Sequence, residues 1–240
     1  MKRAFLLVLI FVIITIAGGA VFAYDEDFES MPKNTVTVDI GPTLLSIGWQ
    51  QLMNSATSGT DAKTSSFGIG AQYERQFSEK VSFGGRFAYL KFGIGQDDFN
   101  LAISSFSIEG HVRYYPGASV FFVDGMLGYA NIAIAISGSG DVEKADGRTV
   151  EEKMNYNIPR DYLKLGVKLG WRVDFGNPGG FVFEPALGWS LGVGLGDTLG
   201  TKLSKKIDGD ATSLDVLFWY AEQFLFVGGP RLSLSFGWRF

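Results

Sequence analysis

The sequence predicts an all-β fold: an eight-stranded antiparallel up-and-down barrel that crosses a membrane with its strands. Eight runs of residues alternate apolar with polar or small side chains, the connections between the runs alternate in length, and glycine and aromatic residues are abundant. Alternation with period two gives each strand one apolar and one polar face. Closure into a ring leaves no unpaired backbone edge in lipid.

The eight runs share this alternation and are longer than the roughly five or six residues of a typical soluble strand. They are 35–49, 66–77, 81–95, 101–115, 120–136, 161–175, 181–195 and 230–240. The run 161–175 is the clearest, because leucine, valine and tryptophan occupy every second position and lysine, glycine and arginine lie between them. Gly41-Pro42 changes the phase of the first run, and Pro185 lacks a ladder donor, so we expect a bulge at the first and a bulge or local break at the second.

The connections alternate in length, as expected when every second one lies in the periplasm. The short connections are 78–80, 116–119 and 176–180, and those on the other side are 50–65, 96–100, 137–160 and 196–229. With both chain termini in the periplasm the number of strands must be even, and the longer loops then lie outside the cell.

The first 23 residues predict a secretory signal peptide. A short basic start at Lys2 and Arg3 precedes an apolar run over 4–17 and a small-x-small pattern at 21–23. The alternative, an uncleaved anchor helix, is disfavoured because the apolar run is shorter than the roughly 20 residues that span a bilayer. Residues 24–240 are then one barrel domain, exported and inserted into a bacterial outer membrane.

Composition excludes several other classes of protein. The formal net charge of −4 argues against a nucleic-acid partner. The absence of cysteine excludes disulfides and a lipidated cysteine anchor, so attachment to the membrane depends on the fold.

The last run ends on alternating apolar residues and a terminal aromatic residue, with Trp238 and Phe240 on the apolar face. This ending resembles the C-terminal signature of bacterial outer-membrane proteins, which implies an assembly signal at these two residues. The implied partners are the barrel-assembly machinery and outer-membrane lipid. Chain length, strand number and loop asymmetry also resemble the small eight-stranded barrels of the OmpA, OmpX and OmpW type, whose members serve as tethers, adhesins, narrow channels for apolar solutes or lipid-modifying enzymes.

Acidic and basic residues fall on the inward face of the runs, near the periplasmic ends. They are Asp39, Glu74, Arg86, Glu109, Arg113, Asp124, Lys164, Lys168, Arg172, Asp174, Glu184 and Arg239. Charges in a narrow apolar interior must be paired, so we predict a structural salt-bridge network that closes the lower lumen. The alternative is an ion-selective constriction, although eight strands enclose little more than side chains.

Higher in the barrel the inward residues are small, mainly glycine, alanine and serine. They predict either an upper cavity above the charged floor or close packing of strongly coiled strands. Leu90, Phe218 and Trp219 are the candidate ligand contacts.

The segment 214–227 is too apolar for a solvated loop. Its periodicity fits a short helix in the last extracellular loop, with Thr212 or Ser213 as N-cap, and fits a strand nearly as well. A helix would cover the mouth or rest on the outer leaflet, whereas a strand would imply a ten-strand barrel with an uncounted partner.

Catalysis has little support in the sequence. The only histidine, His111, faces inward near a periplasmic turn, far from the outer rim where a lipid-modifying enzyme would work. We therefore interpret it as part of the charge network. The acidic stretch 141–146 lacks the ordered spacing of a calcium loop and contains a lysine, so we expect no metal, no cofactor and no catalytic residues.

Two functions remain. The first is a non-catalytic barrel that binds or passes a small, apolar solute through its extracellular mouth. The alternative is a surface-display barrel or adhesin whose loops at 50–65 and 137–160 contact host or cell-surface molecules. A lipid-modifying enzyme is a distant third.

Overall fold

The computed structural model describes residues 33–96, 98–118, 120–143, 149–176, 179–202 and 228–240. Its strands are β1 (Asn34–Asp39), β2 (Lys63–Ser78), β3 (Val81–Gln96), β4 (Phe99–Tyr114), β5 (Phe121–Glu143), β6 (Thr149–Trp171), β7 (Val173–Phe175), β8 (Gly180–Leu195) and β9 (Gly229–Arg239). A helix, α2 (Gly41–Ala56), follows β1, and a 3₁₀ turn spans Pro116–Ala118.

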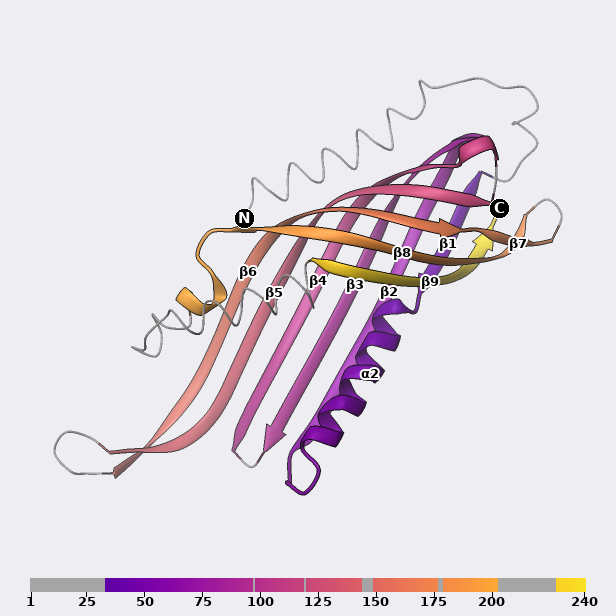
Figure 1. Ribbon diagram of the computed structural model, residues 1–240. Helices are drawn as coiled ribbons and strands as arrows, with labels where there is room; N and C mark the ends of the chain where they lie inside the picture. The colour runs from indigo at the N-terminus through magenta and orange to yellow at the C-terminus, as the bar shows by residue number, and fades with distance from the viewer. Residues whose placement is uncertain (1–32, 97, 119, 144–148, 177–178, 203–227) are drawn as a thin grey trace.

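The strands form one antiparallel ring (Figure 1), which confirms the predicted up-and-down barrel. Each strand pairs with its neighbour in sequence, and β9 pairs with β1 to close the ring. The nine labelled strands make eight in the ring, because β7 continues β6 along the same partner, β8.

The interruption between β6 and β7 has a local cause in Pro185. The β6–β8 pairing runs to Gly170 and Ala186, and the β7–β8 pairing resumes at Val173 and Phe183 with the register unchanged. Pro185 of β8 has no N–H to donate across this gap. The expected local break therefore lies in the neighbouring strand, while β8 itself is continuous and has no bulge.

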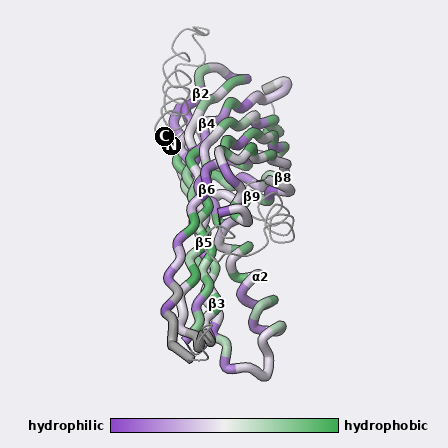
Figure 2. Tube along the Cα trace, turned by 90° about the vertical axis from the view of Figure 1, so that its left-hand side faces the viewer, coloured by the Kyte–Doolittle hydropathy of each residue, from purple (hydrophilic) through white to green (hydrophobic). Residues whose placement is uncertain are grey.

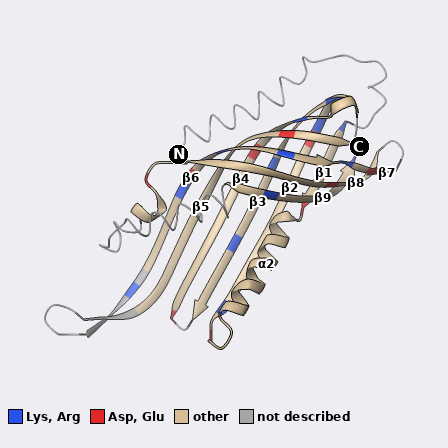
Figure 3. Cartoon of the chain, viewed as in Figure 1, with Lys and Arg blue, Asp and Glu red and all other residues tan. Residues whose placement is uncertain are grey.

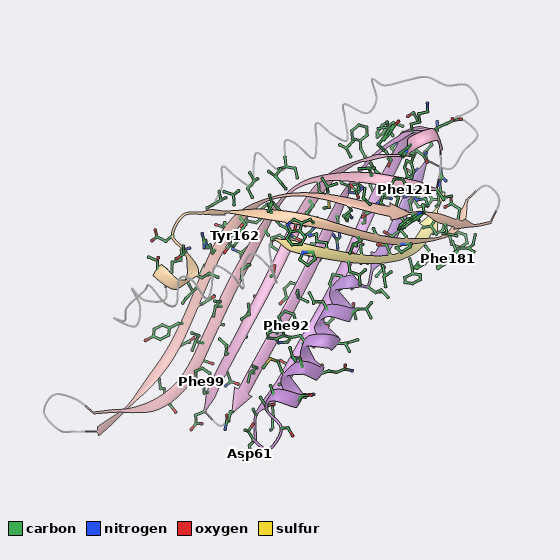
Figure 4. All side chains as sticks on the ribbon, in the orientation of Figure 1. Asp61, Phe92, Phe99, Phe121, Tyr162 and Phe181 are labelled. Carbon is green, nitrogen blue, oxygen red and sulfur yellow. The ribbon has the colours of Figure 1, made fainter. Side chains whose placement is uncertain are left out.

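The two faces of the ring carry unlike side chains. Large apolar residues point outward and are exposed, for example Leu187 at 62% and Trp189 at 50%. Several of their aromatic members lie where the short connections are, a region that we call the short-turn end: the rings of Phe121 and Trp171 are 5.7 Å apart, and Figure 4 labels Phe121 and Phe181 there. An exposed apolar surface bounded by aromatic residues is characteristic of a membrane-spanning barrel.

The first predicted run is wrong beyond residue 39. Strand β1 ends at Asp39, and residues 41–56 form α2 instead of a bulged continuation of the strand. Pro42 cannot donate to a ladder and suits the first turn of a helix. The Asp39 carboxylate accepts a hydrogen bond of 2.8 Å from the Gly41 N–H, which fixes the turn between strand and helix.

Helix α2 lies along the inner face of β2 and β3, on the long-loop side of β1 (Figures 1 and 2). The Thr43 hydroxyl donates to the Gly68 carbonyl at 2.6 Å, and the Trp49 and Phe92 rings are 5.1 Å apart. Phe92 is labelled beside the helix in Figure 4. The predicted 50–65 loop is therefore largely helix and strand, and only 57–62 connects them.

The close approach of α2 to β2 depends on Gly68. A Cβ at this position would lie 2.2 Å from the Pro42 carbonyl oxygen, so we expect Gly68→Val to displace the helix from the wall. The emission of Trp49 should shift to longer wavelength in a variant in which Trp49 is the only tryptophan. Gly85→Val is the matched control, because a Cβ at Gly85 has no heavy atom nearer than 3.8 Å. Equal emission in the two variants would contradict the tight helix–strand contact.

The predicted 137–160 loop is also wrong in extent. Strands β5 and β6 are 23 residues each and stay paired from Phe121–Trp171 to Glu143–Thr149, so the hairpin projects well beyond the other strands (Figure 1). Its inner face carries a buried cluster of Ile132, Ile134 and Ile158 that packs against Leu199. This apolar packing supports strand structure beyond the level where the ring closes.

The predicted segment 214–227, with Phe218 and Trp219, lies outside the described residues. In the same connection, residues 199–202 are helical. Among the described residues, no helix is long and apolar enough to cross a membrane.

Candidate functional site

The lower lumen is centred on Arg113, whose side chain is 1% exposed. Its guanidinium lies 2.7 Å from Glu74, 3.1 Å from Glu184 and 3.4 Å from Asp124, and it stacks 3.8 Å over the Phe122 ring. Three strands from different parts of the ring thus meet at one cation. The arrangement bridges the lumen from wall to wall.

Further cations share the same acids. Arg172 lies 2.9 Å from Glu74 and donates from Nε to Glu184 at 2.5 Å. Lys168 lies 3.3 Å from Asp124. Each buried acid here has at least one buried cation within ion-pair distance, which offsets the cost of removing charges from water.

A second layer lies above, toward the long-loop end, and is centred on Glu109. This carboxylate is 2.9 Å from Lys164, 2.8 Å from Arg231 and 3.7 Å from Arg86. Arg86 also pairs with Asp39, which accepts a 2.9 Å hydrogen bond from Ser233. The two layers together form what we call the ion-pair network: Asp39, Glu74, Arg86, Glu109, Arg113, Asp124, Lys164, Lys168, Arg172, Glu184 and Arg231.

The structure places all twelve predicted lumen residues on the inner side of the ring, and Figure 3 shows the coloured charges concentrated in its closed half. Ten belong to the ion-pair network. Asp174 and Arg239 instead form a separate pair at the short-turn rim, 3.1 Å apart, with Asp174 42% exposed.

Sequence reasoning missed Arg231. Its side chain is 16% exposed and makes a bidentate pair with Glu109, 2.8 Å from each oxygen. Period two along the last strand puts it on the same face as Arg239, so the parity of the run could have identified it. With Arg231, the six predicted acids face seven bases.

His111 lies within the network, at the position that the sequence assigns to it. Its Nε2 atom is 3.7 Å from Glu74, and the residue is 2% exposed. The described residues contain no group of three or more metal-binding side chains.

Above the ion-pair network lies a cavity of about 680 Å³, which we call the α2 cavity. Leu44, Leu45, Gly48, Trp49 and Leu52 of α2 form one side of it. The other lining residues come from the barrel, and Arg86, Lys164 and Arg231 form its charged floor; the rest are Gly41, Pro42, Ala88, Tyr89, Leu90, Ser105, Ser107, Leu187, Gly228, Pro230 and Leu232.

The predicted contact Leu90 lines this cavity and is 8% exposed. The small residues divide by type: Ala88, Ser105 and Ser107 border the cavity, whereas several glycines serve close strand packing. A Cβ at Gly188 would lie 2.2 Å from the Val167 carbonyl oxygen. The empty space of the α2 cavity therefore lies beside small alanine and serine side chains of the barrel wall and beside α2, not beside closely packed strand glycines such as Gly188.

The predicted assembly residues lie at the short-turn end. Trp238 and Phe240 are each 58% exposed on the apolar outer face, and the Phe240 N–H donates to the Asn34 carbonyl at 2.8 Å. Their outward position gives them no part in the lumen or in the α2 cavity.

Fold and site together define a small eight-stranded membrane barrel with an ion-paired lower lumen and an upper cavity. No protein-family model matches the chain, and no curated protein matches it. Among solved structures it is similar to Ail, the attachment invasion locus protein of Yersinia pestis, in complex with the heparin analogue sucrose octasulfate. That match has 11% identity and a TM-score of 0.44 over 87% of this chain and 98% of Ail.

A second structure of Ail gives 11% identity and a TM-score of 0.43 over 88% of this chain and 99% of that one. The translocator domain of the autotransporter NalP from Neisseria meningitidis gives 14% identity and a TM-score of 0.36, covering 68% of this chain and 47% of that domain.

Proposed function

We propose that this chain is an integral outer-membrane β-barrel protein, exported by a signal peptide at 1–23, that binds a small apolar solute in the α2 cavity without catalysis. The observation that carries the proposal is the cavity itself, about 680 Å³ between a helix and the barrel wall. This volume falls within the range of ordinary ligand sites, which are concave and mostly apolar with a few polar groups.

Binding is better supported than passage through the whole barrel. Below the cavity, the side chains of Arg113 and Asp124 are 1% and 0% exposed, and the ion pairs span the lumen. A solute in the α2 cavity therefore meets a charged floor instead of an open channel.

Filling the cavity tests the proposal. A Cβ at Gly48 meets no atom within 4 Å, so Gly48→Trp should fold and place an indole in the cavity. We expect binding of the apolar fluorophore 1-N-phenylnaphthylamine to amphipol-held protein to weaken by about tenfold or more, which is a loss of about 1.4 kcal/mol. The measurement is the rise of probe fluorescence on titration.

Gln51→Trp is the matched control, because Gln51 is exposed on the same helix and does not line the cavity. It should bind the probe like the unchanged protein. If Gly48→Trp also binds the probe unchanged, the cavity is not the binding site and the proposed function is wrong.

A surface-display role is the second candidate, favoured by the projecting β5–β6 hairpin. Its two strands are 23 residues each and stay paired as far as Glu143 and Thr149, well beyond the closed ring. A protein that acts only in this way would keep its contacts with cell-surface molecules in Gly48→Trp, so the same variant separates the two functions.

A further inference from the structure

We propose that the solute is an amphiphile with one anionic head group and an acyl-like chain, and that it enters the α2 cavity sideways from the membrane. This inference rests on the proposed binding function and names its ligand class and route. It is carried by the gap in the barrel wall beside α2 and by the excess positive charge at the cavity floor.

The α2 cavity is bordered by both faces of the barrel sheet. Leu187 and Leu232 point outward toward lipid and are 62% and 57% exposed, yet both line the cavity together with the inward-facing Lys164. A single cavity can touch both faces of a sheet only where it passes around an edge. The cavity therefore opens to the lipid-facing surface as well as to the lumen.

The edge arises because two neighbouring strands, β1 and β9, stop early on the long-loop side. Strand β1 ends at Asp39, which pairs with Gly70, so β1 gives no partner to residues 63–69 of β2. Strand β9 begins at Gly229, which pairs with Ser190 of β8. Above this level α2 stands where wall strands would otherwise continue (Figures 1 and 2).

The helix presents apolar side chains to this gap. Leu44, Leu45 and Leu52 are 42%, 46% and 61% exposed and line the cavity. Exposed leucines beside lipid are compatible with an acyl chain, which needs an apolar surface and no hydrogen-bond partners.

The cavity floor is cationic. Arg86, Lys164 and Arg231 lie within ion-pair distance of Glu109, and Asp39 is the only other acid paired with these cations among the described residues. Three cations thus face two carboxylates. Arg231 is the most exposed of the three, with 16% of its side chain accessible.

An anionic head group would balance this excess charge. Ion pairs that are held away from water are strong, and guanidinium groups bind carboxylate or phosphate by paired hydrogen bonds. A neutral alkane would leave the excess uncompensated, and an ammonium head would be repelled. Charge and apolar surface together favour an anionic amphiphile.

The test uses Trp49, which lines the cavity, as a reporter in amphipol-held protein whose other four tryptophans are changed to phenylalanine. The probes are dibromostearate and its methyl ester, whose bromines quench indole fluorescence. We expect the carboxylate to quench Trp49 at about tenfold lower concentration than the ester, and Arg231→Gln to abolish this preference by weakening carboxylate binding alone.

Arg239→Gln is the control, because it removes the same charge from the same face of the same strand at the opposite end of the barrel. It should keep the preference. Equal quenching by both probes, with no effect of Arg231→Gln, overturns the anionic ligand but leaves the proposed apolar binding intact. Failure of both probes, together with a Gly48→Trp variant that binds the apolar fluorophore normally, rejects the cavity function itself. Quenching that appears only after deletion of 214–227 would identify that segment as the occupant and overturn the proposal.

Discussion

Replacing Arg113 with alanine should lower the free energy of unfolding by about 3–5 kcal/mol, the usual cost of removing one partner from a buried ion pair. Arg113 is 1% exposed and within 3.4 Å of three carboxylates on three other strands. Without it, Arg172 is the one arginine among the described residues that still pairs with Glu184 and Glu74. The stacking of the guanidinium on Phe122 is lost as well.

Urea titration of the protein in detergent, followed by the shift in gel mobility between folded and unfolded barrel, measures the change. Arg75→Ala is the control, because Arg75 is exposed on the outer face of β2, next to Glu74. The free energy of unfolding of Arg75→Ala should differ from that of the unchanged protein by less than about 0.5 kcal/mol, as for an ordinary surface substitution. A stable Arg113→Ala barrel would mean that the ion-pair network contributes little to the fold.

Replacing Arg172 with alanine should convert a silent barrel into a leaking one in a planar lipid bilayer. In the unchanged protein the ion pairs bridge the lumen, and we expect no discrete openings. Arg172→Ala removes a long side chain that holds Glu74 and Glu184. These two carboxylates then share Arg113, so the local charge becomes negative and the leak should select cations.

Arg239→Ala is the matched control for conductance. Arg239 faces inward but pairs with Asp174 at the exposed rim, so its loss leaves the closed layers intact. Discrete openings from the unchanged protein would show that the floor conducts and would favour passage over binding. An anion-selective leak in Arg172→Ala would contradict the assignment of the freed charges.

Much of the fold could be predicted from the sequence because a membrane barrel uses two different solvents. Alternation along 161–175 fixes which residues face lipid, and the inner position of Lys164 and Lys168 follows from the same parity. Register then brings Arg86, Glu109 and their partners to similar heights, although no pairing can be read from one strand alone.

The remaining features depend on contacts between distant parts of the chain. Residues 41–49 alternate well enough to suggest a strand, but Pro42 and the close approach of Gly68 favour the helix that spans 41–56. The 137–160 hairpin contains charges typical of a loop, yet Ile134, Ile158 and Leu199 form a buried cluster that extends the strands. The α2 cavity depends on the first of these results, because α2 forms one side of it, so local patterns could not reveal it.

The closure of the ring has a consequence for how the cylinder holds its shape. Strand β1 meets β9 through five ladder pairs and the hydrogen bonds between Asn34 and Phe240 beside them, whereas β5 and β6 share pairing along all 23 of their residues. The barrel is thus a broad rolled sheet that is closed by a short strand pairing between β1 and β9. Each backbone N–H or C=O group that loses its hydrogen bond in lipid costs several kcal/mol. Even this short seam therefore stays paired while the membrane surrounds it. The surrounding lipid therefore keeps the β1–β9 seam closed, and we expect the barrel to open first at this seam when the lipid is removed.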